Sequence, residues 1–599
     1  MTNLILRRVA ALAAAVSMLI VGAPSVAASG IVVSSLADNV ANDGLCTLRE
    51  AITSANTNTA SGAARGECGA GGATDTITFA VAGTINISAK EPDLSSPMTI
   101  DGAGAIKLQQ SGASAFFVTQ ASSTATLKGL TLTGGHVLYG GAVLNAGTLT
   151  IADSLITGNQ ADTWGGAIAN ANTATLIIRD STISANQSGA GGAIHVGSGG
   201  SVQVIRSTLS ANTAVMGGAI VSEGGSVTLA NSTLSGNTAT DGGGIFMASG
   251  ALTLLNDTIS GNSAAAAGGG IHVPGGSVVT VKNTIIAGNI GATFANVAGT
   301  IDTQVKSLVD VDVASVLDSA GLGDNGGPTA TIGLLATAVT AIDKGDAATC
   351  AASPVSSLDQ RSLGRPAACD IGAVERDKIA PTATAPKAAL RSGAALTGSA
   401  LGVHLAWTGA DNGAGSGIAG YVVARSVNGD SYQIVSSSIA GPAVNVALAS
   451  GATYRFRVRA VDHDGNQGAW VYGPTFSSRL AQQSVASVRY AGAWSTAANV
   501  GASGGSTRYA TKAGASATYT FAGRSIAIVA TRSAASGSMR VYVDGVLRGT
   551  VSLFAASTSY RAQVWQRTWA SAGTHTVKIV VVGTAGHARV DLDAFAFLK

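Results

Sequence analysis

A repeat with a period of 25 or 26 residues restricts the fold of this chain more than any other feature. One copy, GGAIVSEGGSVTLANSTLSGN, occupies residues 217–237. Each copy contains a Gly-Gly pair, and the first glycines of these pairs are Gly140, Gly165, Gly191, Gly217, Gly242 and Gly268. An asparagine follows in step in each copy: Asn159, Asn186, Asn212, Asn237, Asn262 and Asn289. Repeats of roughly 20 to 50 residues are typical of solenoids and propellers.

Three columns of aliphatic residues distinguish between these two architectures. Their members are Val143, Ile168, Ile194, Ile220, Ile245 and Ile271, then Ile151, Ile178, Val204, Leu229, Leu254 and Val281, and finally Ile156, Ile183, Leu209, Leu234, Ile259 and Ile286. Three short segments per repeat predict a triangular coil, whereas a propeller blade needs four strands and about 40 residues. Stacked coils place equivalent residues about 4.8 Å apart, so each column becomes a buried ladder. The 79 glycines and a charged fraction of 11%, against the usual value of about 25%, also argue against helical bundles.

The glycine and asparagine columns are predicted to lie where the chain turns. Glycine has no Cβ and therefore permits tight corners. Asparagine tolerates left-handed backbone angles and hydrogen-bonds to nearby backbone, so we expect the asparagine column to adopt such angles.

The pairing of GGAI with a following asparagine resembles the repeat of polymorphic outer-membrane proteins and related right-handed parallel β-helices. This resemblance covers residues 100–305 and implies an all-β chain that begins with a right-handed parallel β-helix of three strands per coil. Upstream, LCTLREAITSAN has a capping box, Thr47 and Glu50, before an amphipathic pattern, which predicts a short helix over the open end. It resembles the CSLREA motif, with Thr47 in place of the family serine, and implies an N-terminal cap over residues 29–99.

Residues 306–376 contain GDNGGPTATIGLL and DQRSLGRPAACDIGAVE, which resemble the choice-of-anchor Q region that follows such helices. This resemblance implies a C-terminal cap. Two β-sandwich domains are expected after it. Residues 377–480 contain Trp407, Tyr421 and TYRFRVRAVDHDGN and resemble a fibronectin type III domain, in which Tyr454 would be the tyrosine corner. Residues 481–599 resemble a galactose-binding-like jelly roll.

The first 28 residues have the pattern of a cleaved secretory signal peptide. Arg7 and Arg8 precede an apolar run at 9–21, and small residues lead to Ala28. The run is shorter than the roughly 20 residues of a membrane-spanning helix, and no later segment qualifies. We therefore expect a secreted or cell-surface protein with no transmembrane segment in the mature chain.

The four cysteines form two pairs that are close in sequence. Four cysteines allow three connectivities, of which we predict Cys46 to Cys68 and Cys350 to Cys369. Each disulfide would close a loop of about 20 residues, worth roughly 3 kcal/mol in the chain-entropy model. Neither pair has the spacing of a metal site.

Charge is distributed unevenly along the chain, whose formal net charge is +3. Residues 29–376 contain 13 Lys and Arg against 24 Asp and Glu, whereas residues 481–599 contain 12 against 3. This asymmetry predicts an anionic cell-wall polymer or another extracellular polysaccharide as a partner of the basic end. A solvated basic face is the alternative. No nucleic-acid recognition motif is present, so we expect no nucleic acid partner, and we expect a monomer.

Candidate binding residues are aromatic. Tyr139 and Trp164 are one coil apart and are predicted to form a sugar-stacking platform, with packing at the helix edge as the alternative. Trp494, Trp565 and Trp569 are further candidates for stacking on sugars, or else they belong to the core of the last domain. The motif DHDGN at 462–466 is interpreted as a turn, with a calcium loop as the alternative. No other cofactor or metal is indicated.

Catalysis would require clustered carboxylates on the helix. The best cluster contains the weak candidates Asp153, Asp180 and Arg206, in the column that continues as Asn231, Asn256 and Asn283; we interpret it as a polar turn ladder. His195 and His272 are three coils apart and are interpreted as exposed or capped ladder residues.

The sequence thus predicts an exported bacterial surface or matrix protein, a non-catalytic β-helix stalk with C-terminal modules that bind carbohydrate or cell wall. The alternatives are a polysaccharide lyase or glycoside hydrolase acting on the helix face, and a structural protein without a specific ligand.

Overall fold

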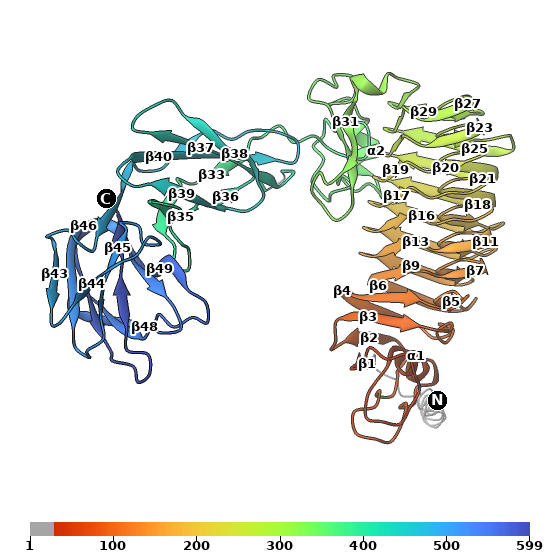
Figure 1. Cartoon of the computed structure of the whole chain (residues 1–599). Coiled ribbons are helices and arrows are strands. Elements are labelled where there is room, and N and C mark those ends of the chain that lie inside the picture. Colours follow the sequence, from red (N-terminus) through yellow and green to blue (C-terminus); the bar gives the residue numbers. More distant parts are fainter. Residues whose placement is uncertain (1–28, 414) are drawn as a thin grey trace, which may run out of the picture. The chain divides into compact units, whose positions relative to one another are not determined.

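The structure, a computed structural model, describes residues 29–413 and 415–599 (Figure 1). The predicted signal peptide, residues 1–28, lies outside the described residues. The chain divides into two compact units, the first ending at Arg376 and the second running from Asp377 to Lys599. Strands dominate both units and helices account for 3% of the chain, which confirms the predicted all-β fold.

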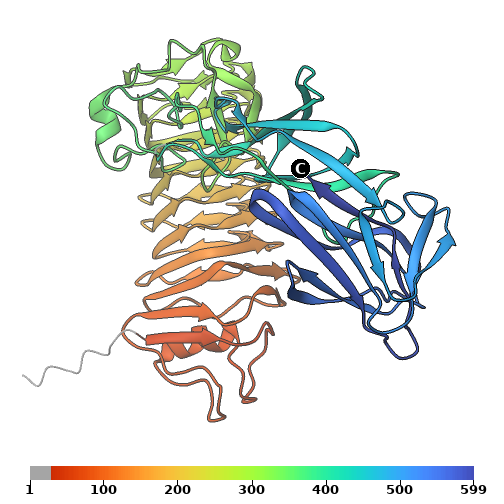
Figure 2. The same cartoon turned by 90° about the vertical axis from the view of Figure 1, so that its left-hand side faces the viewer.

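The first unit contains a parallel β-helix of about nine coils (Figures 1 and 2). Equivalent residues of successive repeats pair side by side, as Ile168 does with Ile194 and Ile194 with Ile220. The first column of strands comprises β5 (Phe117–Thr119), β8 (Val143–Asn145), β12 (Ile168–Asn170), β15 (Ile194–Val196), the starts of β18 (Ile220–Ala230) and β21 (Ile245–Leu255), β24 (Ile271–His272) and β28 (Val297–Ala298).

The second column comprises β1 (Ser29–Val33), β2 (Asp75–Phe79), β4 (Met98–Gln110), β6 (Thr124–Thr133), β9 (Thr148–Ala152), β13 (Thr175–Arg179), β16 (Ser201–Ile205), the ends of β18 and β21, β25 (Ser277–Lys282) and β29 (Thr303–Val305). The third comprises β3 (Gly83–Ile87), the ends of β4 and β6, β10 (Leu155–Thr157), β14 (Thr182–Ser184), β17 (Thr208–Ser210), β19 (Thr233–Ser235), β22 (Thr258–Ser260), β26 (Ile285–Ile286) and β30 (Leu308–Val309). Short corner strands add β7 (His136–Tyr139), β11 (Gln160–Trp164), β20 (Thr238–Ala239), β23 (Ser263–Ala267) and β27 (Ile290–Thr293).

All three predicted aliphatic columns line the interior of the helix, and their members are fully buried in one continuous core. The glycine pairs have two separate functions. The first glycine of each pair has a left-handed φ between +63° and +69°. The second permits close approach of the coils, since a Cβ on Gly166 would lie 2.2 Å from the carbonyl oxygen of Gly192.

The asparagine column corrects one expectation, because its residues do not adopt left-handed angles. They form a buried ladder instead: the side-chain Nδ2 of Asn212 donates to Oδ1 of Asn237 at 2.9 Å, and the backbone N–H of Asn212 donates to the same oxygen. The left-handed angle belongs to the preceding residue, for example Ala211 at +54° or Gly236 at +69°. A buried amide needs its hydrogen bonds satisfied, and each asparagine satisfies the next.

Helix α1 (Leu48–Thr57) lies at the N-terminal end of the coils (Figure 1). It begins with the predicted capping box, in which Thr47 and Glu50 bond to each other's backbone N–H groups. Leu48, Ala51 and Ile52 join the buried core of the β-helix, so the helix covers apolar surface that the first coil would otherwise expose.

Residues 306–376, in the region predicted as a C-terminal cap, begin in the last coil with β30 and then lie along the flank of the coils. They include η1 (Val313–Ser315), β31 (Leu317–Gly323), β32 (Thr331–Leu334) and α2 (Ala347–Ala351). Their contacts run over successive coils, from Thr208, which donates to the Ala330 carbonyl, to Asn283, which donates to the Asp346 carbonyl. We call residues 306–376 the lateral segment.

The second unit is built on one antiparallel sheet ordered β38-β37-β40-β42-β51-β46-β49-β47-β48, to which β41 and β43 are paired. The strands of the second unit are β33 (Thr382–Ala383), β34 (Lys387–Leu390), β35 (Ala400–Ala406), β36 (Gly409–Ala410), β37 (Ile418–Val427), β38 (Gln433–Ile439), β39 (Ala443–Ala449), β40 (Thr453–Asp462), β41 (Val471–Tyr472), β42 (Phe476–Gln482), β43 (Val488–Ala491), β44 (Ser495–Ala498), β45 (Ser506–Ala510), β46 (Ser516–Arg532), β47 (Ser538–Val543), β48 (Val546–Ser552), β49 (Ser559–Val581), β50 (Val590–Leu592) and β51 (Ala594–Leu598). The strands outside the large sheet form three smaller sheets, β33-β36, β34-β35-β39 and β44-β45-β50.

The predicted boundary between residues 480 and 481 falls within β42. Strand β42 pairs with both β40 and β51, so the sheet continues across that boundary. The Tyr454 hydroxyl donates to the Ala449 carbonyl at 3.1 Å, the bond expected of a tyrosine corner.

The two predicted disulfides, Cys46–Cys68 and Cys350–Cys369, are confirmed. Among residues 29–413 and 415–599, no helix has the length and apolar character that crossing a membrane requires.

Candidate functional site

Three rings from successive coils stack on one outer face of the β-helix. Tyr139 ends β7 and Trp164 ends β11, and the parallel pairing of these strands brings the two rings to a centroid distance of 4.9 Å. His195 of β15 lies on the other side of Trp164, also at 4.9 Å and tilted by 11°. The sequence-predicted pair is therefore brought together, with a third ring that the sequence analysis assigned to a ladder.

These rings border a cavity of about 340 Å³, which we call the aromatic hollow. Its remaining lining residues are Leu144, Ala169, Ala171 and Asn172. Tyr139 and Trp164 are each 37% exposed, whereas His195 is only 5% exposed. Trp164 stacks with both Tyr139 and His195, so the three rings form one wall of the hollow. Aromatic rings, small alanines and a side-chain amide suit a ligand with both apolar and polar faces.

His195 provides a buried polar group at this site. Its Nε2 lies 3.4 Å from the Glu223 carboxylate and has no hydrogen-bond partner. Burial lowers the pKa of His195, against the attraction of Glu223, so the ring is neutral at neutral pH. Sequence reasoning interpreted His195 as an exposed or capped ladder residue and did not place it against Trp164. The sequence contained one signal of the contact between His195 and Trp164. Ala190, which lies in the next coil and pairs with Trp164, is too small to cover the Trp164 ring.

Two of the three weak catalytic candidates line a second cavity, of about 360 Å³, which we call the acidic hollow. Asp153 and Asp180 line it together with Pro328 of the lateral segment. Both aspartates and Arg206 have left-handed φ angles, consistent with a turn ladder. Arg206 forms a two-pronged ion pair with Asp180, with both N···O distances at 2.7 Å, which raises the pKa of Arg206. Asp180 thus has a permanent cation as its bidentate partner.

The C-terminal tryptophans do not form a common platform. Trp494, Trp565 and Trp569 are partly buried against the core of the second unit. Trp569 stacks on His575 at 3.9 Å, and Trp494 packs beside Tyr490 at 5.2 Å. Trp494 and Trp569 therefore each have a ring partner, whereas Trp565 packs against the core.

Two carboxylate clusters among the described residues have a geometry that a metal ion needs. Asp377, Asp411 and Asp462 gather around DHDGN, the motif interpreted as a turn with a calcium loop as the alternative. Burial raises the pKa of Asp462, and the two neighbouring carboxylates raise it further. Asn466 donates to both oxygens of Asp462.

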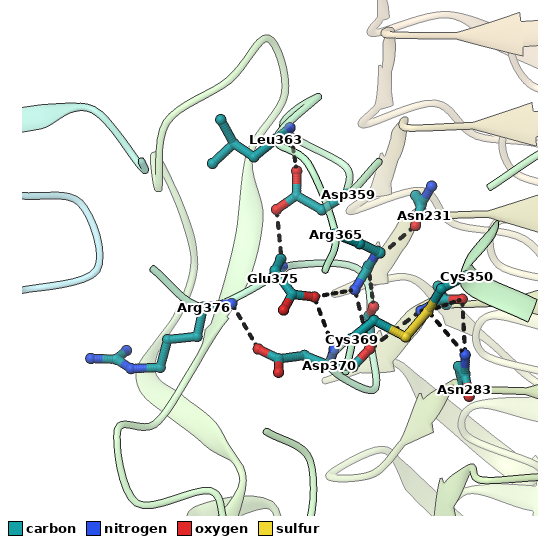
Figure 3. A network of polar contacts seen from close by, with 12 residues as sticks. Asn231, Asn283, Cys350, Asp359, Leu363, Arg365, Cys369, Asp370, Glu375 and Arg376 are labelled. Carbon is teal, nitrogen blue, oxygen red and sulfur yellow. Dashed lines mark hydrogen bonds and ion pairs between the residues drawn. A yellow bond between two sulfur atoms is a disulfide. The ribbon is translucent and has the colours of Figure 1, made fainter. Parts of the chain in front are cut away.

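The other cluster, Asp343, Asp370 and Glu375, belongs to the lateral segment. Figure 3 shows Asp370 and Glu375. The buried guanidinium of Arg365 contacts Glu375 at 3.1 Å, so a cation of the protein is already paired with one carboxylate of this cluster.

Comparison with known proteins supports the β-helix. The sequence model of the family described as "Right handed beta helix region" matches residues 98–234. One relative, the A type blood N-acetyl-alpha-D-galactosamine deacetylase of Flavonifractor plautii, is 32% identical over 113 residues, 19% of this chain. The chain spans 14% of the length of that relative.

Solved structures with local likeness include a family two carbohydrate esterase from Cellvibrio japonicus, at 16% identity and a TM-score of 0.16. That match covers 21% of this chain and 34% of the esterase. Another is the CBM36-1 domain of a multidomain xylanase from the hindgut metagenome of Trinervitermes trinervoides, at 13% identity and a TM-score of 0.17. It covers 20% of this chain and 97% of that domain.

Proposed function

We propose that the protein is an exported surface or matrix protein that binds a polysaccharide and does not cleave it. The observation that carries this proposal is the aromatic hollow, where stacked rings from three coils border a cavity with a side-chain amide. Sugars present apolar C–H faces and hydroxyl groups, which aromatic surfaces and amides match. The relative from Flavonifractor plautii carries a name that concerns an amino sugar, which is in line with a glycan ligand.

Export is supported by the two disulfides, since disulfide bonds persist in oxidising compartments. Binding without cleavage is supported by the carboxylates at the two hollows. Glycoside hydrolysis commonly needs one carboxylic acid to donate a proton and a second carboxylate. Near the aromatic hollow Glu223 faces His195, and in the acidic hollow Asp180 is paired with Arg206.

The proposal is tested by measuring glycan binding to the full chain by calorimetry over a panel of neutral and acidic polysaccharides. Trp164→Ala is expected to weaken binding roughly tenfold or more, because it removes a central aromatic contact. Met216→Ala is the matched control, since Met216 is 36% exposed and continues the same column two coils further on. Absence of binding by the unaltered protein, or equal losses in both variants, would refute the aromatic hollow as the binding site.

A polysaccharide lyase or hydrolase at the acidic hollow is the second candidate, because that cavity joins Asp153 and Asp180. The full chain is incubated with the same panel, with and without calcium, and reducing ends and unsaturated products are followed. We expect neither product. Release of either product by the unaltered chain, if it disappears in Asp153→Ala or Asp180→Ala, would establish the enzymatic alternative.

A further inference from the structure

One face of strand β40 in the second unit carries a row of three arginines. Arg455, Arg457 and Arg459 alternate along the strand with the core residues Tyr454, Phe456 and Val458. Alternation places all three guanidinium groups on the side of the sheet that faces away from this core. Successive arginines are spaced by about 7 Å along the strand.

Aromatic side chains hold this row in place. The guanidinium carbon of Arg457 lies 4.2 Å from the ring centroid of Trp470 and 4.3 Å from that of Tyr432. Arg459 lies 4.6 Å from Trp470, and Arg455 lies 5.0 Å from Tyr472. We call these six residues the arginine face.

The arginine face has no carboxylate of its own. Within the described part of the chain, none of its arginines forms an ion pair, and the Nε–H groups of Arg457 and Arg459 are without hydrogen-bond partners. Arg455 donates through Nε to the Gly473 carbonyl, and Arg457 donates to the Tyr472 hydroxyl. Three adjacent cations fixed by stacking, without counter-charges, form a surface of positive potential that favours an anion.

We propose that the arginine face binds an acidic polysaccharide through the carboxylate groups of successive sugars. Guanidinium groups present paired N–H donors that match carboxylates, and a polymer with regularly repeated carboxylates meets a regularly repeated row of arginines. Single-stranded nucleic acid fits less well, because its bases stack on free aromatic faces, whereas the faces of Tyr432 and Trp470 are already covered by guanidinium groups.

This inference names a ligand class for the second unit, and it rests on the proposed function only in that the ligand is a glycan. The residues involved lie between 432 and 472, whereas the aromatic hollow is formed by residues of the first unit. Variants of the two sites therefore separate the failure of one proposal from the failure of the other.

The test measures binding of the full chain to polygalacturonate, to its fully methyl-esterified form and to an oligothymidylate. We expect binding to polygalacturonate that weakens as NaCl is raised from about 0.05 M to about 0.5 M. The ester, which has the same sugars without charge, should bind weakly. The triple variant R455Q/R457Q/R459Q should weaken polygalacturonate binding by at least about tenfold.

The matched control is R489Q/R540Q/R548Q, which removes the same charge at three exposed arginines of the second unit. It should bind polygalacturonate within about twofold of the unaltered chain. R455K/R457K/R459K keeps the positive charges but loses the planar guanidinium groups, so it is also expected to bind polygalacturonate more weakly. It replaces the glutamine variant if thermal unfolding shows that the glutamine variant is misfolded. No polygalacturonate binding, equal losses in the control, or tighter binding to oligothymidylate would each overturn the proposal.

Discussion

At the residue scale, carboxylates of the first unit differ in how well they are neutralised. Asp180 has a bidentate cation partner in Arg206. Glu91 is fully buried, and neither of its oxygens accepts a hydrogen bond. Its nearest cation is Arg49, whose Nη2 lies 3.7 Å away and whose Nε bonds to Asp38 at 2.8 Å. Burial therefore raises the pKa of Glu91 to about 8, against the weaker opposing attraction of Arg49.

This raised pKa predicts a pH-dependent stability. A group whose pKa is higher in the folded protein contributes stability that is fully present below its unfolded pKa and is lost as pH rises through the folded value. We expect the unfolding free energy of the unaltered chain to fall, relative to Glu91→Gln, between about pH 4.5 and about pH 8. Denaturant titrations at pH 5 and pH 9 measure this difference. The exposed Asp43→Asn is the control, and an equal Glu91→Gln effect at both pH values would contradict the prediction.

The site residues were predictable only within a column. Tyr139 and Trp164 share a repeat position, so the period alone placed one ring over the other. His195 belongs to a different column, and its contact with Trp164 depends on the small size of Ala190 at the intervening corner. Such contacts between columns depend on side-chain volume, which a repeat period does not encode.

At the element scale, each coil is stabilised by its neighbours. Backbone pairing joins every column, and the asparagine ladder adds a second set of bonds inside one corner, from Asn159 through Asn289. From Asn186 onward, each Oδ1 accepts both a side-chain and a backbone N–H from the preceding coil, as Asn237 does from Asn212. Loss of one amide therefore leaves several buried donors and acceptors without partners.

Asn212→Ala is expected to lower the unfolding free energy by about 1–3 kcal/mol or more, the cost of unsatisfied buried groups. Asn186 would lose the oxygen that accepts both its backbone and side-chain N–H groups. The neighbouring exposed Thr213→Ala should change stability by less than about 0.5 kcal/mol. Urea unfolding followed by circular dichroism compares the two. A loss no larger in Asn212→Ala than in Thr213→Ala would show that the ladder contributes little.

The repeat made the three strand columns predictable, because each residue was read in six equivalent copies. The lateral segment has no repeat, so its position could not be derived in this way. One signal was present: the turn column changes from Asp153, Asp180 and Arg206 to Asn231, Asn256 and Asn283. The structure gives the physical reason, since the three asparagines are fully buried under residues 306–376 whereas Asp153 is exposed. A charged side chain would be costly under that cover.

At the scale of the whole molecule, the lateral segment joins coils that otherwise contact only their neighbours. Gln360 donates to the Ser207 carbonyl and accepts from Thr233, and Arg365 reaches Asn231. Further along, the backbone N–H of Ala373 donates to Thr258. A solenoid without such a lateral segment is expected to open coil by coil. The lateral segment therefore couples the C-terminal coils of the helix into one cooperative region.

Arg365→Met tests this coupling. Arg365 is buried and donates to Glu375, to Asn231 and to three backbone carbonyls, so its loss leaves Glu375 buried without its cation (Figure 3). Removing one partner of a buried ion pair costs about 3–5 kcal/mol. Hydrogen exchange is expected to accelerate in residues 306–376 and in coils from 207 to 289, while residues 98–160 stay protected.

The control is Arg179→Met, which removes an exposed arginine from a coil to which the lateral segment does not bond. It should leave the hydrogen-exchange pattern unchanged. Faster exchange throughout the first unit in Arg365→Met would mean that the β-helix unfolds as one body, because the coupling would then extend beyond the coils that the lateral segment contacts. Unchanged exchange would mean that backbone pairing alone holds the C-terminal coils. Only faster hydrogen exchange confined to the lateral segment and the coils that it contacts agrees with a lateral segment that couples these coils.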